Sequence, residues 1–85
     1  MTTLVVEQVR AIGVRFVDDV LHVALSDKRE ISVPMEHVPW LEWLVKATPA
    51  QRADWSIEPQ GFAIYWDELD DGIEICHLLG MQPMA

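Results

Sequence analysis

Apolar and polar side chains alternate along residues 12–25, which is the pattern of β-strands with one buried face. The apolar positions are Ile12, Val14, Phe16, Leu21, Val23 and Leu25. A two-residue loop at residues 18–19 would place Ile12 opposite Leu25 and leave the other apolar pairs on the same face. The pattern therefore predicts an antiparallel hairpin that is half buried.

A second hairpin follows, because Ile31 and Val33 continue the alternation after a polar turn. A two-residue turn would mix the two faces, so we expect a longer or bulged turn. In that register Leu25 lies opposite Ile31, and Val23 lies opposite Val33. Pro34 has no N–H to donate to a strand ladder, so this strand should end there.

The centre of the chain changes to helical spacing, since apolar side chains in residues 40–47 recur every three or four positions. They are Trp40, Trp43, Leu44 and Ala47. Thr48, Pro49 and Gln51 then suit an N-cap, the first helical position and a capping box. The sequence predicts two consecutive helices, of which the second ends near Asp54.

A third hairpin is predicted from the alternation on both sides of a Pro-Gln-Gly turn at residues 59–61. Its apolar positions are Trp55, Ile57, Phe62, Ile64 and Trp66. The register depends on whether Gly61 forms a bulge, and both registers remain open. An acidic segment at residues 67–72 leads to apolar residues at 73–79, which fit either a last strand or a helical turn.

These elements define an α+β fold with a small antiparallel β-sheet, made of two N-terminal hairpins and one C-terminal hairpin. The central helical excursion should pack on one face of the sheet. A chain of 85 residues is too short for two cores, so residues 1–85 form a single domain. We expect its core within about residues 10–80 and a mobile tail at residues 81–85.

Composition excludes several classes of protein. Hydrophobic residues make up 51% of the chain and charged residues 24%, which excludes a disordered acidic tail. No apolar run approaches the roughly 20 residues of a membrane span, and no signal-peptide pattern is present. The single cysteine, Cys76, forms no internal disulfide, so we expect a cytoplasmic protein without membrane contact. The net charge of −8 argues against direct binding to nucleic acid.

The acidic residues are concentrated, because four of the fourteen lie between positions 67 and 71. They are Asp67, Glu68, Asp70 and Asp71. A calcium loop of the EF-hand type needs oxygen ligands at alternating positions and a distal glutamate, and Leu69 interrupts that order. A solvated loop, or an acidic face for a basic partner, fits better. We therefore expect no bound metal and no cofactor.

The other reactive side chains show no catalytic arrangement. Apart from the adjacent Cys76 and His77, none of the three histidines stands at metal-ligand spacing, and adjacent residues rarely point at one ion. Cys76 lies in an apolar run with acidic surroundings, where we expect a buried and inert thiol. The glycines are scattered and form no phosphate loop. We expect that the protein is not an enzyme.

Four tryptophans are many for this length, and filling a small core explains most of them. Trp43 fits the core stripe of the helical segment. Trp40 borders a loop and Trp66 abuts the acidic segment, so both are candidates for an interface. The candidate partner-binding residues are therefore Trp66, Asp67, Glu68, Asp70, Asp71 and Trp40.

Two motifs are the most distinctive in the chain. They are Ala-Thr-Pro-Ala-Gln-Arg at residues 47–52 and Gly-Phe-Ala-Ile-Tyr-Trp-Asp-Glu-Leu-Asp-Asp-Gly-Ile-Glu-Ile at residues 61–75. With Gly-Val-Arg-Phe at residues 13–16, Leu-His-Val at residues 21–23, residues 25–34 and Trp55, they resemble a bacterial family, Domain of Unknown Function 2442. The resemblance covers about residues 10–80.

The resemblance implies a small α+β domain with an antiparallel sheet and a helical excursion. Members of this family stand alone or are fused to helix-turn-helix domains. Many look like one half of a two-gene pair, which suggests an antitoxin-like or regulatory role. No catalytic residues carry over from the family. This chain is too short to add a helix-turn-helix, so direct control of transcription is not expected.

The sequence therefore supports two hypotheses about function. The leading hypothesis is a protein-interaction module, the acidic partner of a small basic protein, since charge complementarity speeds encounter and rejects wrong partners. The alternative is a domain that senses a metal or a small ligand without catalysis, with aromatic side chains lining a pocket. Pairing of two copies through a sheet edge or an apolar patch also remains open.

Overall fold

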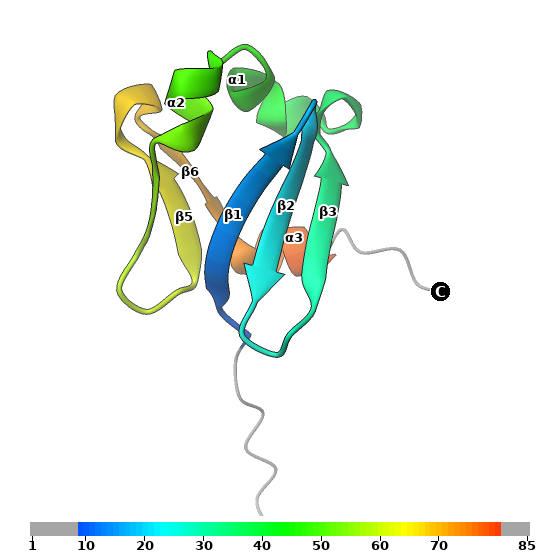
Figure 1. Cartoon of the computed structure of the whole chain (residues 1–85), viewed down its shortest axis with the longest axis vertical. Coiled ribbons are helices and arrows are strands. Elements are labelled where there is room, and N and C mark those ends of the chain that lie inside the picture. The colour runs from blue at the N-terminus through cyan, green and yellow to red at the C-terminus, as the bar shows by residue number, and fades with distance from the viewer. Residues whose placement is uncertain (1–8, 81–85) are drawn as a thin grey trace, which may run out of the picture.

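The computed structural model describes residues 9–80, which contain two three-stranded antiparallel sheets (Figure 1). The first sheet has the order β1-β2-β3, with β1 Ala11–Val17, β2 Val20–Leu25 and β3 Glu30–Pro34. The second has the order β4-β5-β6, with β4 Trp55–Ile57, β5 Ala63–Trp66 and β6 Asp71–Glu74. The predicted α+β class and hairpins are confirmed, with the strands divided between two sheets. The tail expected at residues 81–85 lies outside the described residues.

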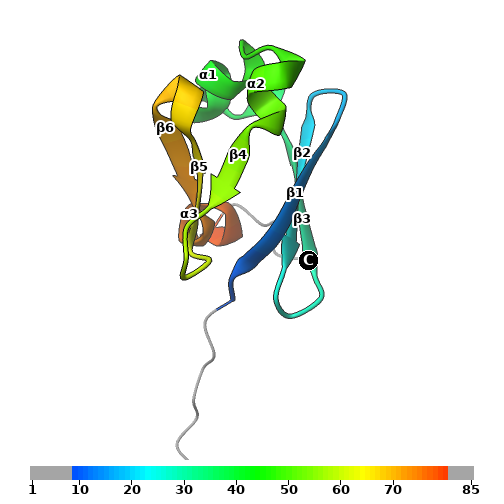
Figure 2. The ribbon, with the colours of Figure 1, turned by 60° about the vertical axis from the view of Figure 1, so that its left-hand side comes forward.

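Short helices connect and cover the two sheets. They are η1 Met35–His37, η2 Pro39–Leu41, α1 Glu42–Val45, α2 Pro49–Ala53, η3 Asp67–Leu69 and α3 Ile75–Gly80. The helices α1 and α2 lie together at one end of both sheets, whereas α3 lies toward the other end (Figure 2). The helical excursion therefore bridges the sheets at that end.

The β1–β2 hairpin follows the predicted register near its turn and leaves it near its open end. Val14 lies opposite Val23, as expected. The register then shifts between residues 11 and 13, so that Ala11 lies opposite Leu25. The prediction that Ile12 faces Leu25 is therefore wrong, and the Ile12 side chain is 65% exposed. One extra residue in a strand turns the following side chains to the opposite face.

The β2–β3 hairpin has the predicted faces but a different register. Val23 lies opposite Ile31, and not opposite Val33 as predicted. The turn has three residues, 26–28, and ends with Lys28 in the left-handed conformation, at φ 73°. A turn longer than two residues was expected and is confirmed. It begins one residue earlier than the predicted register implies, so the pairing along β3 shifts by two positions and the same faces stay together.

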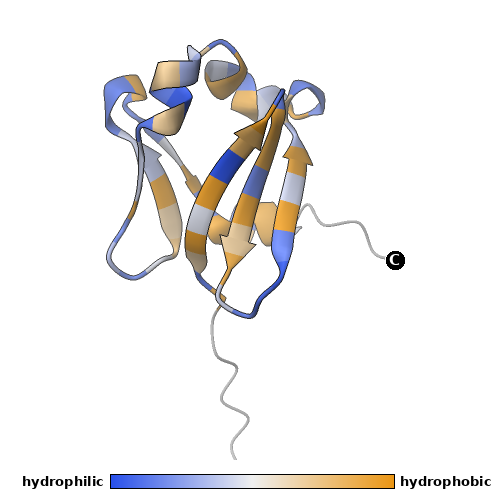
Figure 3. Ribbon diagram, in the orientation of Figure 1, coloured by the Kyte–Doolittle hydropathy of each residue, from blue (hydrophilic) through white to orange (hydrophobic). Residues whose placement is uncertain are grey.

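One hydrophobic core fills the space between the sheets and the helical segment. Trp66 is 0% exposed and lies near its centre, with its ring edge-on to Trp43 at a centroid distance of 5.6 Å. The other fully buried large side chains are Leu21, Leu25, Ile31, Met35, Leu41, Leu44, Ile64, Ile73, Ile75, Leu78 and Val23. Figure 3 shows the apolar and polar bands that alternate along the first sheet. This alternation allows a thin sheet to bury one face and keep the other solvated.

The helix α2 has the predicted start. The Thr48 hydroxyl accepts a hydrogen bond from the Gln51 backbone N–H at 3.1 Å, and the Gln51 side chain accepts one from the Thr48 N–H at 2.9 Å. This capping box and Pro49 in the first turn are confirmed, and the helix ends at Ala53. The preceding helical stretch is broken into η2 and the four-residue α1, which leaves Trp40 outside the core.

Arg52, in the last turn of α2, connects segments that are far apart in the sequence. Its guanidinium donates hydrogen bonds to the backbone oxygens of Leu44 and Val45 at 3.0 and 2.9 Å. It also donates to the backbone oxygen of Asp18 at 3.2 Å and to the Asp19 carboxylate at 3.0 Å. The side chain therefore joins the end of α1 to the β1–β2 turn.

Candidate functional site

The acidic segment after β5 is partly helical and partly extended. Residues 67–69 form η3, Asp70 has a left-handed backbone at φ 50°, and Asp71 already begins β6. All four predicted acidic side chains are exposed, whereas Leu69 packs against the core. We call Asp67, Glu68, Asp70 and Asp71 the acidic turn. The four exposed carboxylates therefore lie within one turn between β5 and β6.

Local hydrogen bonds shape the acidic turn. The Tyr65 hydroxyl donates to an Asp70 carboxylate oxygen at 2.6 Å, and this hydrogen bond raises the pKa of Tyr65 above its usual value. The Asp71 carboxylate accepts from the Gly72 N–H at 2.8 Å. Within residues 9–80, no Lys or Arg lies within ion-pair distance of Asp67 or Glu68. These two carboxylates are left without a basic partner in this part of the chain.

Charge is distributed very unevenly along the chain. Residues 1–52 hold seven acidic and six basic residues, whereas residues 53–85 hold seven acidic residues and no Lys or Arg. Four ion pairs of the described residues join Arg15 to Glu30 (3.1 Å), Arg29 to Asp27 (2.6 Å), Lys46 to Glu42 (2.7 Å) and Arg52 to Asp19 (3.0 Å). Both partners of each pair come from the first segment. The acidic turn thus belongs to a segment with no Lys or Arg of its own.

The two tryptophans proposed for an interface have different surroundings. Trp66 is fully buried, and its indole N–H donates to the Arg52 backbone oxygen at 2.9 Å. It alternates with the exposed Tyr65 along β5, so its side chain points into the core and its assignment to a partner surface is wrong. Trp40 is 44% exposed, and its ring meets the ring of His77 edge-on at 6.4 Å. Trp40 therefore stays a surface residue, beside α3.

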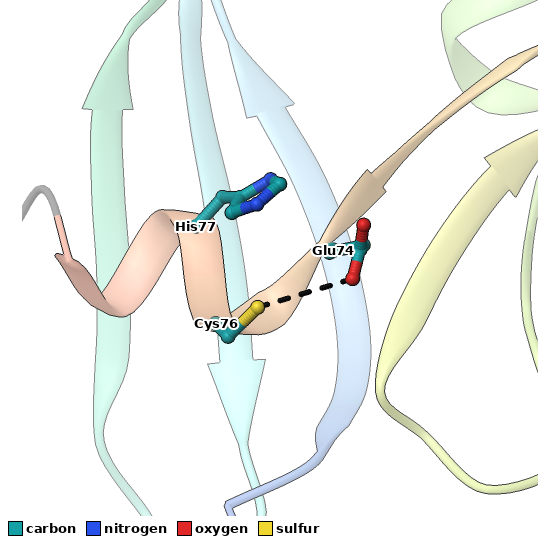
Figure 4. A group of neighbouring side chains, drawn as sticks. All are labelled: Glu74, Cys76 and His77. Atoms are coloured by element: carbon teal, nitrogen blue, oxygen red, sulfur yellow. Dashed lines mark hydrogen bonds between the residues drawn. The ribbon is translucent and has the colours of Figure 1, made fainter.

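A group of donor side chains that the sequence did not suggest lies where β6 meets α3 (Figure 4). Potential ligand atoms of Glu74, Cys76 and His77 all lie within 4.8 Å of one another, and all three side chains are exposed. The expectation that Cys76 is buried is wrong, because Ile75 and Leu78 anchor α3 in its place. The closely spaced Glu-Ile-Cys-His sequence, at a change from strand to helix, is the signal that could have indicated this group.

A cleft of about 410 Å³ lies between β1, α2 and β4. Its lining residues are Val14, Arg15, Phe16, Asp18, Pro49, Arg52, Ala53 and Trp55. The guanidinium carbon of Arg52 lies 5.7 Å from the centre of the Phe16 ring, a cation–π contact. The cleft therefore combines aromatic walls with the Arg52 guanidinium, whereas the Arg15 guanidinium pairs with Glu30.

A pair of carboxyl groups lies close together in the charge-balanced part of the molecule. Hydrogen bonding with Glu36, and then with Arg52, lowers the pKa of Asp19 below its usual value. The same contact with Asp19 raises the pKa of Glu36. Glu36 therefore holds a proton more readily than an isolated glutamate, and Asp19 stays ionised beside it.

The fold and the surface define a small α+β domain with two three-stranded sheets and one acidic corner. The model of a protein family of unknown function, DUF2442, matches residues 11–80, so the chain belongs to this family. Among curated proteins, no sequence matches it at a significant level. No helix of the described residues is long and apolar enough to cross a membrane.

Two solved structures share this fold. One is a protein of unknown function from Rhodospirillum rubrum, with a TM-score of 0.71 and 22% identity over 87% of this chain and 88% of that chain. The other is an uncharacterized protein from Chromobacterium violaceum, with a TM-score of 0.68 and 23% identity over 84% of this chain and 64% of that chain. At these identities the likeness shows the fold alone.

Proposed function

We propose that the chain is a cytoplasmic protein-interaction module whose acidic turn binds the basic surface of a small protein partner. In this proposal it acts by binding and not by catalysis, in an antitoxin-like or regulatory role. The observation that carries the proposal is the exposed acidic turn in a segment of 33 residues, 53–85, without Lys or Arg.

Electrostatics supports this function. Like charges close together on a surface repel one another, and a basic partner relieves this repulsion when it binds. The field of such a surface also speeds the encounter with a basic protein, and salt weakens that attraction. The carboxylates of the first segment do not offer the same attraction, because their own Lys and Arg neutralise several of them.

The experiment compares two baits with the same change in net charge. The test variant carries Asp67→Asn, Glu68→Gln and Asp71→Asn, and it keeps Asp70 because that carboxylate accepts the Tyr65 hydrogen bond. The control variant carries Asp18→Asn, Glu36→Gln and Glu42→Gln in the first segment. Each tagged chain is used to capture partners from an extract of its source cells, and the captured partner is then purified and titrated.

The proposal requires a basic protein that binds stoichiometrically to the wild-type chain and to the control variant. Its affinity for the test variant should fall at least about tenfold, and its affinity for the wild type should fall steeply as salt rises. A partner that binds both variants equally would overturn the assignment of the acidic turn. Capture of no stoichiometric basic partner would overturn the function itself.

The cleft between β1, α2 and β4 supports a second candidate function, the binding of a small ligand. Its volume of about 410 Å³ lies within the usual range of ligand pockets, and Phe16 and Trp55 give it aromatic walls. Because the guanidinium groups of Arg15 and Arg52 already pair with Glu30 and Asp19, an uncharged ligand with an apolar, aromatic body is the best fit. Thermal melts with a panel of aromatic metabolites test this function. A shift that disappears in Trp55→Leu supports it, and no shift with any compound refutes it.

A further inference from the structure

The three donor groups at the β6–α3 junction differ in chemistry and lie close together. A thiol, an imidazole and a carboxylate are the three kinds of protein ligand that Zn²⁺ accepts. The Cys76 sulfur lies 3.9 Å from Glu74 Oε2, and one donor atom of His77 lies within 4.8 Å of both groups. Ligands at zinc bond lengths around a tetrahedral ion are about 3.5 Å apart. Small rotations of three exposed side chains would close the difference.

The fold explains why these side chains lie on the same part of the surface. Ile73 points into the core from β6, so its neighbour Glu74 points outward. Ile75 and Leu78 then anchor one face of α3, three residues apart, and Cys76 and His77 fall between them on the exposed side. The change from strand to helix at Ile75 therefore places Glu74 of β6 close to Cys76 and His77 of α3.

The surroundings favour a divalent cation. No Lys or Arg occurs in residues 53–85, so no basic side chain of this segment competes with a metal for Glu74. The ring of Trp40 lies edge-on to His77, with 6.4 Å between the ring centroids. A thiolate and an imidazole also distinguish the group from sites for Ca²⁺ and Mg²⁺, which prefer oxygen ligands only.

We propose that Glu74, Cys76 and His77 form a zinc site at the β6–α3 junction, with water as the fourth ligand. Binding of Zn²⁺ converts the Cys76 thiol to a thiolate and releases its proton to the buffer, so no oxidant or reductant is consumed. The open fourth position resembles the three-ligand arrangement of catalytic zinc sites rather than that of closed structural sites. The site stands independently of the acidic turn and its partner.

The experiment titrates the whole chain with Co²⁺ and then with Zn²⁺. A phosphine keeps Cys76 reduced, because a thiol reductant would itself bind the metal. Cys76 is the only cysteine, so a thiolate-to-cobalt charge-transfer band in the near ultraviolet reports that residue alone. We expect one Co²⁺ per chain, a thiolate band, and displacement by Zn²⁺. The Cys76→Ser variant should lose the band.

The ligand variants have matched controls. His77→Ala should weaken zinc binding by more than about 100-fold, because loss of even an outer-shell partner costs roughly 10–100-fold. His37→Ala removes an exposed histidine elsewhere and should leave the affinity within twofold. The variant with three amides in the acidic turn should retain the metal, which separates this test from that of the partner.

Two results would overturn the zinc site. One is the absence of a thiolate band at saturating Co²⁺. The other is equal zinc affinity in the wild type and His77→Ala, which would place the metal on surface carboxylates. Circular dichroism checks that each variant is folded, and Glu74→Gln provides a third variant that leaves the α3 residues unchanged.

Discussion

The two sheets contribute to one core in the same way, yet they carry charge differently. In the first sheet and the central helices, four Lys or Arg side chains pair with carboxylates at 2.6–3.1 Å. The segment that builds the second sheet has seven acidic residues and no Lys or Arg. Both sheets nevertheless bury alternate side chains, such as Val23 in β2 and Ile64 in β5.

The difference shows that the acidic excess is not a requirement of the fold. Alternation of apolar and polar positions satisfies the core in both sheets, and any polar residue would serve on the outer face. A net charge of −7 in residues 53–85 adds repulsion that folding alone would not favour. This surplus is the reason to seek a binding role on the second sheet and not on the first.

The largest expected effect tests the core that the two sheets share. Trp66→Ala should lower the free energy of unfolding by about 3–5 kcal/mol, because it removes a fully buried ring between both sheets. Trp40→Ala, at a site that is 44% exposed, should cost less than about 1 kcal/mol. Urea unfolding measures both values. Similar losses for the two variants would contradict the placement of Trp66.

A methyl group added at a glycine should destabilise the second sheet more than the first. A Cβ on Gly72 would lie 2.7 Å from the Ile64 carbonyl oxygen, so Gly72→Ala should destabilise the second sheet by about 1–3 kcal/mol. A Cβ on Gly13 would meet only the Ala24 side chain, at 3.8 Å. Gly13→Ala should therefore be neutral or stabilising in the same urea experiment. A loss at Gly13 equal to that at Gly72 would contradict this comparison.

The capping box of α2, the helix that connects the two sheets along the chain, should contribute less to stability. Thr48→Ala removes the capping box of α2 and should cost about 1 kcal/mol in thermal or urea unfolding. Thr48→Ser keeps a hydroxyl that can accept from Gln51 and should retain most of that stability. If serine and alanine destabilise equally, the hydrogen bond at 3.1 Å is not the source of the effect.

The smallest expected effect concerns pH and the charge-balanced part of the molecule. The raised pKa of Glu36 means that its protonated form is favoured in the folded state. This contribution is fully present below the unfolded value of 4.5 and is lost as pH rises through the folded pKa. Glu36→Gln imitates the protonated form, so it should raise the melting temperature at pH 7 and have little effect near pH 4.

Asp27→Asn, which should change the melting temperature at pH 7 in the opposite direction, serves as the control for that pH profile. The Arg29 backbone N–H, which donates to Asp27 at 3.1 Å, lowers the pKa of Asp27. The stability from this carboxylate is present above its unfolded value of 3.8 and is lost as pH falls. Asp27→Asn should therefore lower the melting temperature at pH 7. Parallel profiles for Glu36→Gln and Asp27→Asn would contradict the coupling of Glu36 with Asp19.

Local patterns in the sequence were sufficient to predict the elements of the fold but not all of their pairing. Alternation identified the hairpins, and the order of Thr48, Pro49 and Gln51 identified the start of α2. The bulge before Gly13 was not predictable, because a bulge depends on how β1 fits its partners in space. The β2–β3 register was missed because several turns preserve the same faces.

The candidate site was predictable where charge decides exposure and unpredictable where packing decides it. Carboxylates are rarely buried unpaired, so the exposed positions of the acidic turn followed from residue type. The position of Trp66 beside that turn suggested exposure, but its place in β5 directs it inward. Cys76 was misplaced because the period of burial changes from strand to helix at Ile75, and that boundary is weakly marked in the sequence.

The hydrogen bonds of Arg52 have a consequence for local opening of the structure. One guanidinium holds the end of α1 and the β1–β2 turn together, although residues 18 and 52 are 34 positions apart. If either segment moves away, it breaks its hydrogen bonds with the same guanidinium that holds the other segment. Amide groups in these two segments should therefore exchange their hydrogens as one cooperative unit, which no inspection of either segment alone would suggest.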